Sequence, residues 1–146
     1  MTFAGQIVLG FAWTCVTLAI AVGFIIILIE FFHLIERPLR HFPGGGRRGI
    51  LLIASVLWML LAMIAVVFAW AALFQTLGAF SNLEDAFYLA MVSITTVGFG
   101  DVVLGREWRI LSGFTAAEGF IIFGLDTAVL FEMMRRLRND QAMIDR

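Results

Sequence analysis

The segment TTVGFGD at residues 95–101 has residue types and a spacing that could coordinate a cation through its backbone. A cation that leaves water needs a ring of oxygens in place of its hydration shell, and peptide carbonyls can supply them. Consecutive carbonyls normally point in different directions, so aiming them at one axis requires alternating backbone handedness, which costs little only at glycine. Gly98 and Gly100 stand at alternate positions, as this geometry requires. Val97 and Phe99 would then point outward and brace the segment against the preceding helix.

A short helix is predicted directly before this segment, over residues 83–94. The sequence before it has the form of a capping box, with Ser81 as the N-cap and Glu84 reaching back. A helix of this length rises only about 18 Å, so it cannot cross a bilayer and should be re-entrant, buried in protein or lining water. Its C-terminus, the negative end of the helix dipole, would point to the membrane centre, where it favours a cation.

Three long apolar stretches surround this unit, at residues 7–29, 50–76 and 110–130. Each is long enough to cross about 30 Å of hydrocarbon. The 146-residue chain is 62% hydrophobic, which is far above the usage of soluble proteins and indicates an integral membrane protein. A signal peptide is the alternative for the first stretch, but no positive charge precedes that stretch and it is long.

The basic residues predict the orientation of the chain. Residues 30–48 contain four arginines together with prolines and glycines that should end helices and form a linker. The last apolar stretch continues into the basic residues 135–138. The positive-inside rule places both segments in the cytoplasm, so the N-terminus should lie outside, with the plasma (inner) membrane as the expected location.

Charge and chemistry exclude several function classes. The net charge of −1 argues against a nucleic-acid partner. Cys15 is the only cysteine, so no intrachain disulfide or cysteine zinc site is expected, and we predict a small buried hydrophobe there. Because the sequence has no nucleophile–base pair, phosphate loop or metal cluster, we expect neither an enzyme nor an organic cofactor.

The TTVGFGD segment resembles the selectivity-filter signature TVGYGD or TVGFGD of tetrameric potassium channels. The resemblance covers residues 50–137, as outer helix, pore helix, filter and inner helix, and leaves the first span as an addition. It implies that K⁺ ions are coordinated by the carbonyls of Thr96, Val97, Gly98 and Phe99, with the Thr96 hydroxyl at the inner end. Because one chain carries one such segment, it also implies a homotetramer. A glycine-containing turn in a membrane loop is the alternative for the segment.

The predicted fold is thus an all-α membrane protein with three transmembrane helices, a re-entrant pore helix and a selectivity filter. Its expected divisions are an N-terminal transmembrane helix at 1–36, a cytoplasmic linker at 37–49, a pore domain at 50–138 and a short cytoplasmic tail at 139–146.

The resemblance also assigns roles in the last span. Gly119 matches the inner-helix glycine at which family members bend, although it could instead permit close helix packing. Phe123, Thr127 and Phe131 lie on one helical stripe, and a ring of Phe131 side chains would close the pore by dewetting. Packing of Phe131 against the outer helix is the alternative. Asp126 borders this stripe, and inward rectifiers of the family use an acid in this helix to hold cytoplasmic cationic blockers.

Some positions around the filter have no obvious partner in the sequence. Thr95, Gly100 and Asp101 are expected to support the filter. Some bacterial members bond the filter aspartate to a buried glutamate where this chain has Val92, so Tyr88, on the same helix face, is the candidate partner. Glu118 is ionisable inside a span, which is costly and usually functional, and we expect it to pair with a buried group behind the filter.

The sequence therefore predicts a potassium-selective channel subunit that conducts passively in a lipid bilayer. Two alternatives remain at this stage, a non-selective cation channel on the same scaffold and a non-conducting accessory membrane protein.

Overall fold

The computed structural model describes residues 2–36 and 44–144. They form four helices, α1 (Phe3–Glu36), α2 (Gly44–Thr76), α3 (Leu83–Ile94) and α4 (Arg109–Ile144). Helices α1, α2 and α4 contain segments that are long and apolar enough to cross a membrane, at Phe3–Phe31, Gly49–Thr76 and Arg109–Arg136. The predicted all-α arrangement of three spans and one short helix is confirmed, including both ends of α3.

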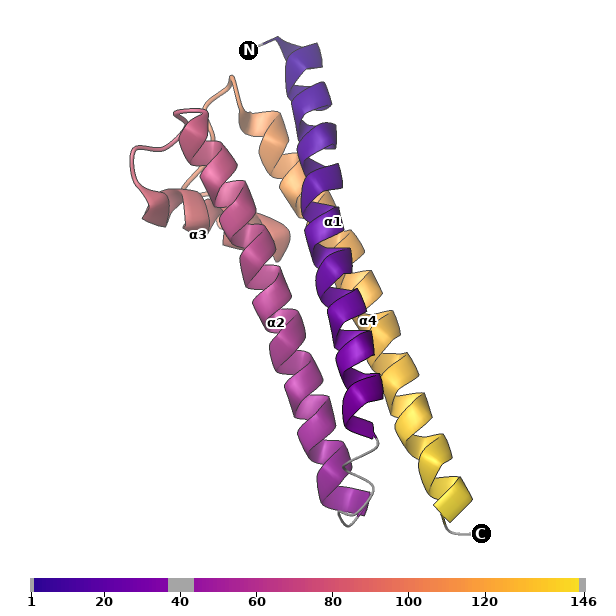
Figure 1. The fold of residues 1–146 in the computed structure, drawn as a ribbon. Coiled ribbons are helices and arrows are strands. Elements are labelled where there is room, and N and C mark those ends of the chain that lie inside the picture. The colour runs from indigo at the N-terminus through magenta and orange to yellow at the C-terminus, as the bar shows by residue number, and fades with distance from the viewer. Residues whose placement is uncertain (1, 37–43, 145–146) are drawn as a thin grey trace.

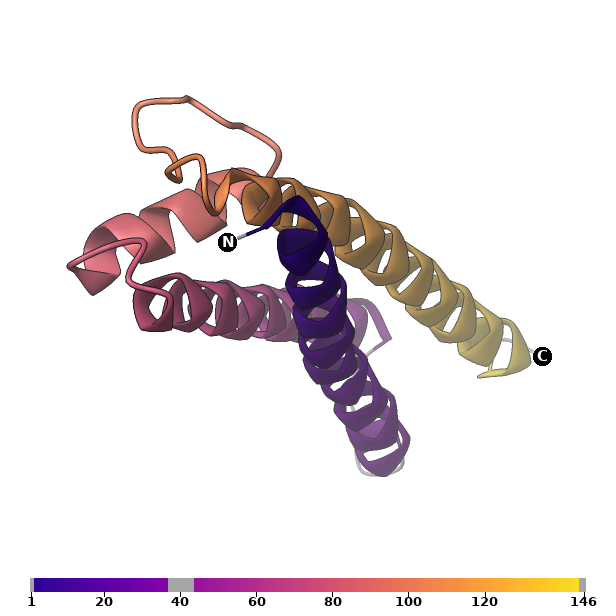
Figure 2. The same ribbon diagram turned by 90° about the horizontal axis from the view of Figure 1, so that it is seen from above.

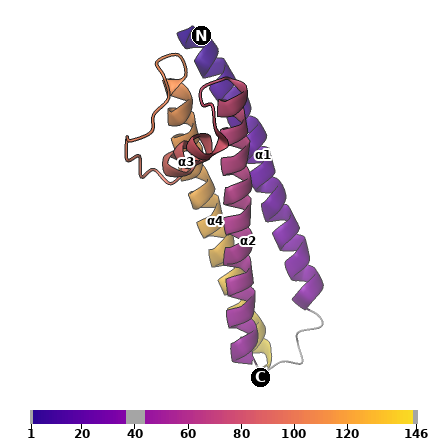
Figure 3. The same cartoon turned by 90° about the vertical axis from the view of Figure 1, so that its left-hand side faces the viewer.

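The three long helices form an elongated bundle in which α1 and α4 run in one direction and α2 in the other (Figure 1). The short helix α3 lies across the bundle near the N-terminus of α1 and packs against α2 and α4. Helix α1 also packs against α2 and α4, but from the side opposite to α3 (Figure 3). Seen from above, the loop between α3 and α4 arches away from α1 (Figure 2). The loop is therefore carried by α2, α3 and α4, with α1 behind them.

The core of the bundle lies where α3 meets α2 and α4. Trp70 and Phe74 of α2 are fully buried there, and the centroids of their rings are 5.6 Å apart. Ala86 and Ala90 of α3 are also fully buried. Small side chains one turn apart on α3 allow its backbone to approach α2 closely.

Helix α3 ends against α4 at Gly119. A Cβ atom on Gly119 would overlap the carbonyl oxygen of Ile94, the last residue of α3, so only glycine fits there. Gly119 stands ten residues after Arg109, the first residue of α4, which corresponds to about 15 Å along the helix, half the thickness of the hydrocarbon core. Of the two interpretations of Gly119, the structure supports close packing, and α4 is continuous through it. Bending at Gly119 stays a prediction.

Some helix ends and one side chain differ from the sequence predictions. Helix α2 begins at Gly44, so it includes glycines that were predicted to lie in the linker. A long helix that has already formed extends readily by one more hydrogen-bonded residue, and each glycine added to its N-terminus costs only about 1 kcal/mol. Residues 37–43 of that linker lie outside the described part. Helix α4 continues to Ile144, beyond the predicted end of the pore domain at 138. Cys15 is exposed, not buried, because it lies off the α1 stripe that includes Gly10, Thr17 and Ala21.

Replacing Gly119 tests the contact between α3 and α4. We expect Gly119→Ala to lower the free energy of unfolding by more than about 2 kcal/mol, because the added methyl group overlaps a backbone carbonyl that has no room to move. Gly113→Ala in the same helix is the control, since a Cβ atom there meets nothing within 4 Å. Thermal unfolding in detergent, followed by circular dichroism, measures both. Equal stability of the two variants would contradict the close contact.

Candidate functional site

The N-terminus of α3 is capped by Asn82, not by Ser81. The Asn82 side-chain oxygen accepts a hydrogen bond of 2.7 Å from the Asp85 backbone N–H, and its amide nitrogen donates one of 2.9 Å to the Asp85 carboxylate. The predicted capping box with Glu84 is therefore wrong by one residue. The reason is positional, since a helix that begins at Leu83 has residue 82 as its N-cap and residue 85 as its third helical residue.

The C-terminus of α3 holds the start of the TTVGFGD segment. Thr95 is the C-cap, and its hydroxyl donates a hydrogen bond of 2.8 Å to the Met91 carbonyl. The Gly98 N–H donates to the Val92 carbonyl at 3.1 Å. The Met91 carbonyl also accepts the Thr95 backbone N–H at 3.0 Å, whereas the Val92 carbonyl is one of those in the last helical turn that have no partner within the helix. The position of the segment is thus fixed by the end of α3.

Backbone handedness alternates along the segment. Gly98 and Gly100 have φ values of 53° and 78°, in the left-handed region, as predicted. Thr96 also has a positive φ, of 58°. A left-handed threonine is not expected from residue type, because a β-branched residue avoids the left-handed region, which costs it about 1–2 kcal/mol. Residues 96, 98 and 100 therefore share one handedness, while Val97 and Phe99 between them do not.

The apolar side chains of the segment are not covered within one chain. Val97 is 53% exposed and Phe99 is 71% exposed. More than half of each side chain is therefore uncovered within one chain, and the expected brace against the preceding helix stays a prediction. A cavity of about 460 Å³ lies beside the segment, and its lining includes Val92 of α3, Gly98, Gly100 and Arg109 of α4. Within one chain, residues 96–101 are all exposed.

Tyr88 and Asp101 join α3 to the far end of the segment. The Tyr88 hydroxyl donates a hydrogen bond of 2.7 Å to the Asp101 carboxylate, the contact for which the sequence offered Tyr88 as a candidate. This bond favours the charged carboxylate and lowers the pKa of Asp101, and it holds the phenol in its neutral form and raises the pKa of Tyr88. The segment is thus tied to α3 at both ends.

The residues assigned to the pore lie along one side of α4. Phe123 and Phe131 are 41% and 66% exposed, and Thr127 is exposed as well. Asp126 lines a groove of about 310 Å³ between α2 and α4, together with Phe123 and Thr127. Phe120 is 77% exposed, more than Phe123 or Phe131, and it was not among the predicted pore residues. Phe120 stands eleven residues, or about three helical turns, before Phe131, and this spacing could have placed Phe120 on the same side of α4.

Glu118 is the buried acid of α4. Its side chain is fully buried, and its Oε2 atom accepts hydrogen bonds from the Thr17 hydroxyl at 2.8 Å and from the Trp70 indole N–H at 2.6 Å. Glu118 thus pairs with buried groups, one of which comes from α1.

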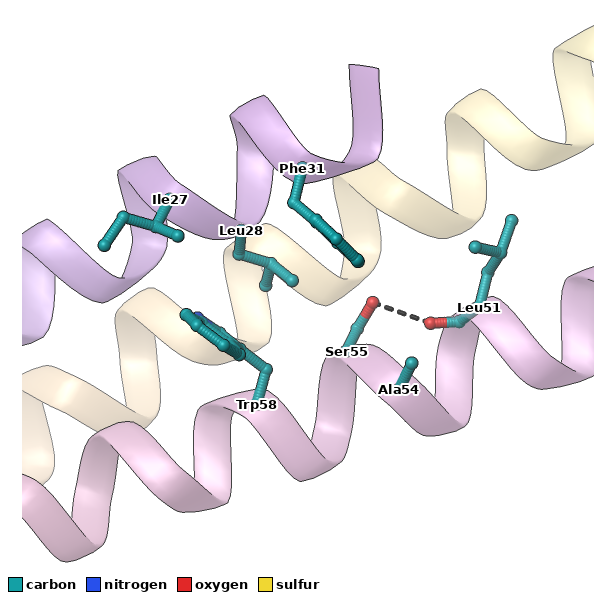
Figure 4. Close-up of a pocket in the computed structure, with 7 residues that line it drawn as sticks. All are labelled: Ile27, Leu28, Phe31, Leu51, Ala54, Ser55 and Trp58. Atoms are coloured by element: carbon teal, nitrogen blue, oxygen red, sulfur yellow. Dashed lines mark hydrogen bonds between the residues drawn. The ribbon is translucent and has the colours of Figure 1, made fainter. Parts of the chain in front are cut away.

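A second cavity, of about 180 Å³, lies between α1 and α2 (Figure 4). Its lining is apolar except for Ser55, whose hydroxyl donates to the Leu51 carbonyl at 2.8 Å and is thereby satisfied within its own helix. The cavity offers no free polar side chain to an ion. It is lined by Ile27, Leu28, Phe31, Leu51, Ala54, Ser55 and Trp58.

Comparison with known proteins identifies a family for the part of the chain that carries the TTVGFGD segment. A family model described as "Ion channel" matches residues 53–136. The match contains most of α2, all of α3, the TTVGFGD segment and α4 as far as Arg136, and it leaves α1 outside. No curated protein and no solved structure matches the chain.

The single tyrosine of the chain allows the Tyr88–Asp101 bond to be tested directly. Tyr88 should titrate above its ordinary pKa, because charging the phenol breaks the bond. The bond's contribution to stability is present below the unfolded pKa and is lost as the pH rises through the folded pKa. In Asp101→Asn the pKa of Tyr88 should fall towards the ordinary value, as measured by tyrosinate absorbance in detergent. Glu84→Gln, a neighbouring exposed acid, is the control. Identical titration of wild type and Asp101→Asn would refute the bond.

Proposed function

Because the chain belongs to the ion channel family, we propose that it is a potassium-selective channel subunit that conducts K⁺ passively. It is a multi-pass integral membrane protein and an ion channel, not an enzyme, as the sequence predicted. The selectivity for potassium rests on one observation, the alternating backbone handedness of the TTVGFGD segment at the end of a short helix.

In the proposed mechanism, the carbonyls of Thr96, Val97, Gly98 and Phe99 replace the hydration shell of K⁺, and the Thr96 hydroxyl adds an oxygen at the inner end. Left-handed residues at alternate positions are what turns successive peptide groups towards one axis. The negative end of the α3 dipole favours the cation at the same depth. No organic cofactor takes part, and the K⁺ ions are the cargo.

We further propose a homotetramer around a four-fold axis, because a single chain supplies only one of the segments that a closed ring needs. Two features support assembly. The first is the exposure of Val97 and Phe99 beside an open cavity, and the second is the exposure of Phe120 and Phe131 on α4. Large apolar side chains of this kind are expected to face the other copies around the axis, while the remaining apolar surface faces the lipid bilayer.

In this assembly the N-terminus lies outside and the C-terminus in the cytoplasm, as the arginines indicate. The α4 stripe of Phe123, Thr127 and Phe131 lines the path below the filter. The four Phe131 side chains form its narrowest apolar ring, which closes by dewetting. Asp126 lies beside this path, where a carboxylate attracts cytoplasmic cationic blockers such as magnesium, and weaker magnesium block in Asp126→Asn tests that role.

Ion flux from liposomes tests the proposed function. Purified protein should dissipate a K⁺ gradient and leave a Na⁺ gradient largely intact, and reversal potentials in mixed K⁺ and Na⁺ should follow K⁺. Equal fluxes of both ions would favour the non-selective cation channel. No flux, together with no tetramer by mass, would favour the accessory membrane protein.

The left-handed glycines provide a matched pair of variants. Gly98→Ala should abolish K⁺ flux, because a left-handed alanine costs about 1–2 kcal/mol and the segment can relax by turning its carbonyls away. Gly78→Ala is the control, since Gly78 has a similar φ of 68° and equal space but lies in the turn after α2. It should lose a similar amount of stability and retain flux. Retained K⁺ flux in Gly98→Ala would count against the filter.

The gate is tested at Phe131. Phe131→Ala should widen the apolar ring and raise the single-channel open probability in planar bilayers, since a wider constriction stays wet. Phe31→Ala, which removes an exposed phenylalanine from α1, should leave the open probability unchanged. The gate assignment fails if both variants behave alike.

A further inference from the structure

We propose that α1 controls the pore through Glu118, a positioning residue that holds α4 at the point where α4 meets α3. Thr17 of α1 and Trp70 of α2 are the residues that anchor it. The inference rests on the proposed function and extends it to the helix that lies outside the family match.

Glu118 brings three helices together at one oxygen atom. Both of its hydrogen bonds are accepted by Oε2, one from α1 and one from α2, while the residue itself belongs to α4. The side chain is fully buried in a segment long enough to span the membrane. A carboxyl group at such a depth is costly unless it is hydrogen-bonded, so the two donors are needed to keep it there.

The anchor lies one residue away from the contact that places the filter segment. Gly119 follows Glu118 and touches the carbonyl of Ile94, after which the TTVGFGD segment begins. Adjacent helical residues point about 100° apart, so Glu118 faces α1 and α2 while Gly119 faces α3. A shift of α4 at Glu118 therefore changes its contact with the end of α3 directly.

Helix α1 contacts the first part of α4 at three points. The Ile110 N–H donates to the Gln6 side-chain oxygen at 3.3 Å, which satisfies one of the free N–H groups in the first turn of α4. One turn further, Gly10 lies against the Phe114 ring, which a Cβ atom on Gly10 would overlap. The Thr17–Glu118 bond is the third point. All three lie in the first ten residues of α4, the part next to α3, so α1 supports the end of the bundle that holds the segment.

A hydrogen bond fixes direction as well as distance, whereas apolar packing alone lets helices slide. We therefore expect loss of the Thr17 hydroxyl to alter the balance between closed and open α4 rather than to prevent folding. Thr115 provides a matched comparison. It is a fully buried threonine on α4 whose hydroxyl donates to the Leu111 carbonyl of its own helix, at 2.9 Å. The Thr17 hydroxyl likewise lies 2.9 Å from the Trp13 carbonyl of its own helix, but it also lies 2.8 Å from Glu118 Oε2, and this contact with another helix distinguishes Thr17 from Thr115.

The experiment records single-channel open probability and tetramer melting temperature for wild type, Thr17→Val, Thr17→Ser and Thr115→Val. Thr17→Val should change open probability about fivefold, the effect of one lost hydrogen bond on an equilibrium. Thr17→Ser, which restores the hydroxyl, and Thr115→Val should match wild type. In a Glu118→Met background, Thr17→Val should have no further effect, because the partner is already absent.

Unchanged open probability in Thr17→Val, with or without a lower melting temperature, would overturn the inference and leave the proposed function intact, provided that wild type conducts K⁺. Wild-type protein that carries no K⁺ current would overturn both. If Thr17→Val does not assemble, Trp70→Phe removes the other donor and keeps a buried aromatic ring, and its open probability is judged by the same criterion.

Discussion

The contact between the end of α3 and Gly119 is the constraint on which the rest of the structure depends. A helix can stop in the middle of a membrane only if its free carbonyls find partners and protein surrounds it. Here α4 approaches so closely at Gly119 that no side chain fits between it and the Ile94 carbonyl. Helix α3 also packs against α2, and its small residues Ala86 and Ala90 are fully buried. Behind these helices, α1 reaches the same level of α4 through Thr17 and Glu118.

This packing allows the TTVGFGD segment to adopt a conformation that would not persist alone. Thr96 is held in the left-handed region at a cost of about 1–2 kcal/mol, so its surroundings must determine its conformation. The Gly98–Val92 backbone bond fixes the middle of the segment, and the Asp101–Tyr88 bond fixes its far end. Val92 and Tyr88 are one turn apart on α3, so the segment runs back along a single helix and should move with that helix as one unit.

Patterns that are local in the sequence predicted most of this architecture. The spans follow from length and hydropathy, and the bounds of α3 and the left-handed glycines follow from short motifs. The N-cap at Asn82 was missed because Ser81 offered an equally good cap one residue earlier. The left-handed Thr96 runs against its own propensity, and tertiary context determines it. The pairing of Thr17 with Glu118 joins residues 101 positions apart, so no periodicity within either helix could reveal it.

In the proposed channel, peptide oxygens of several chains converge on one axis and bind dehydrated K⁺. Crystallography of the assembled protein in thallium, an anomalous scatterer that replaces K⁺, tests this most directly. We predict a row of anomalous peaks on the four-fold axis, level with the carbonyls of residues 96–99, and no such peaks in sodium. An axis without peaks, or peptide groups of residues 96–99 that point away from it, would contradict the account.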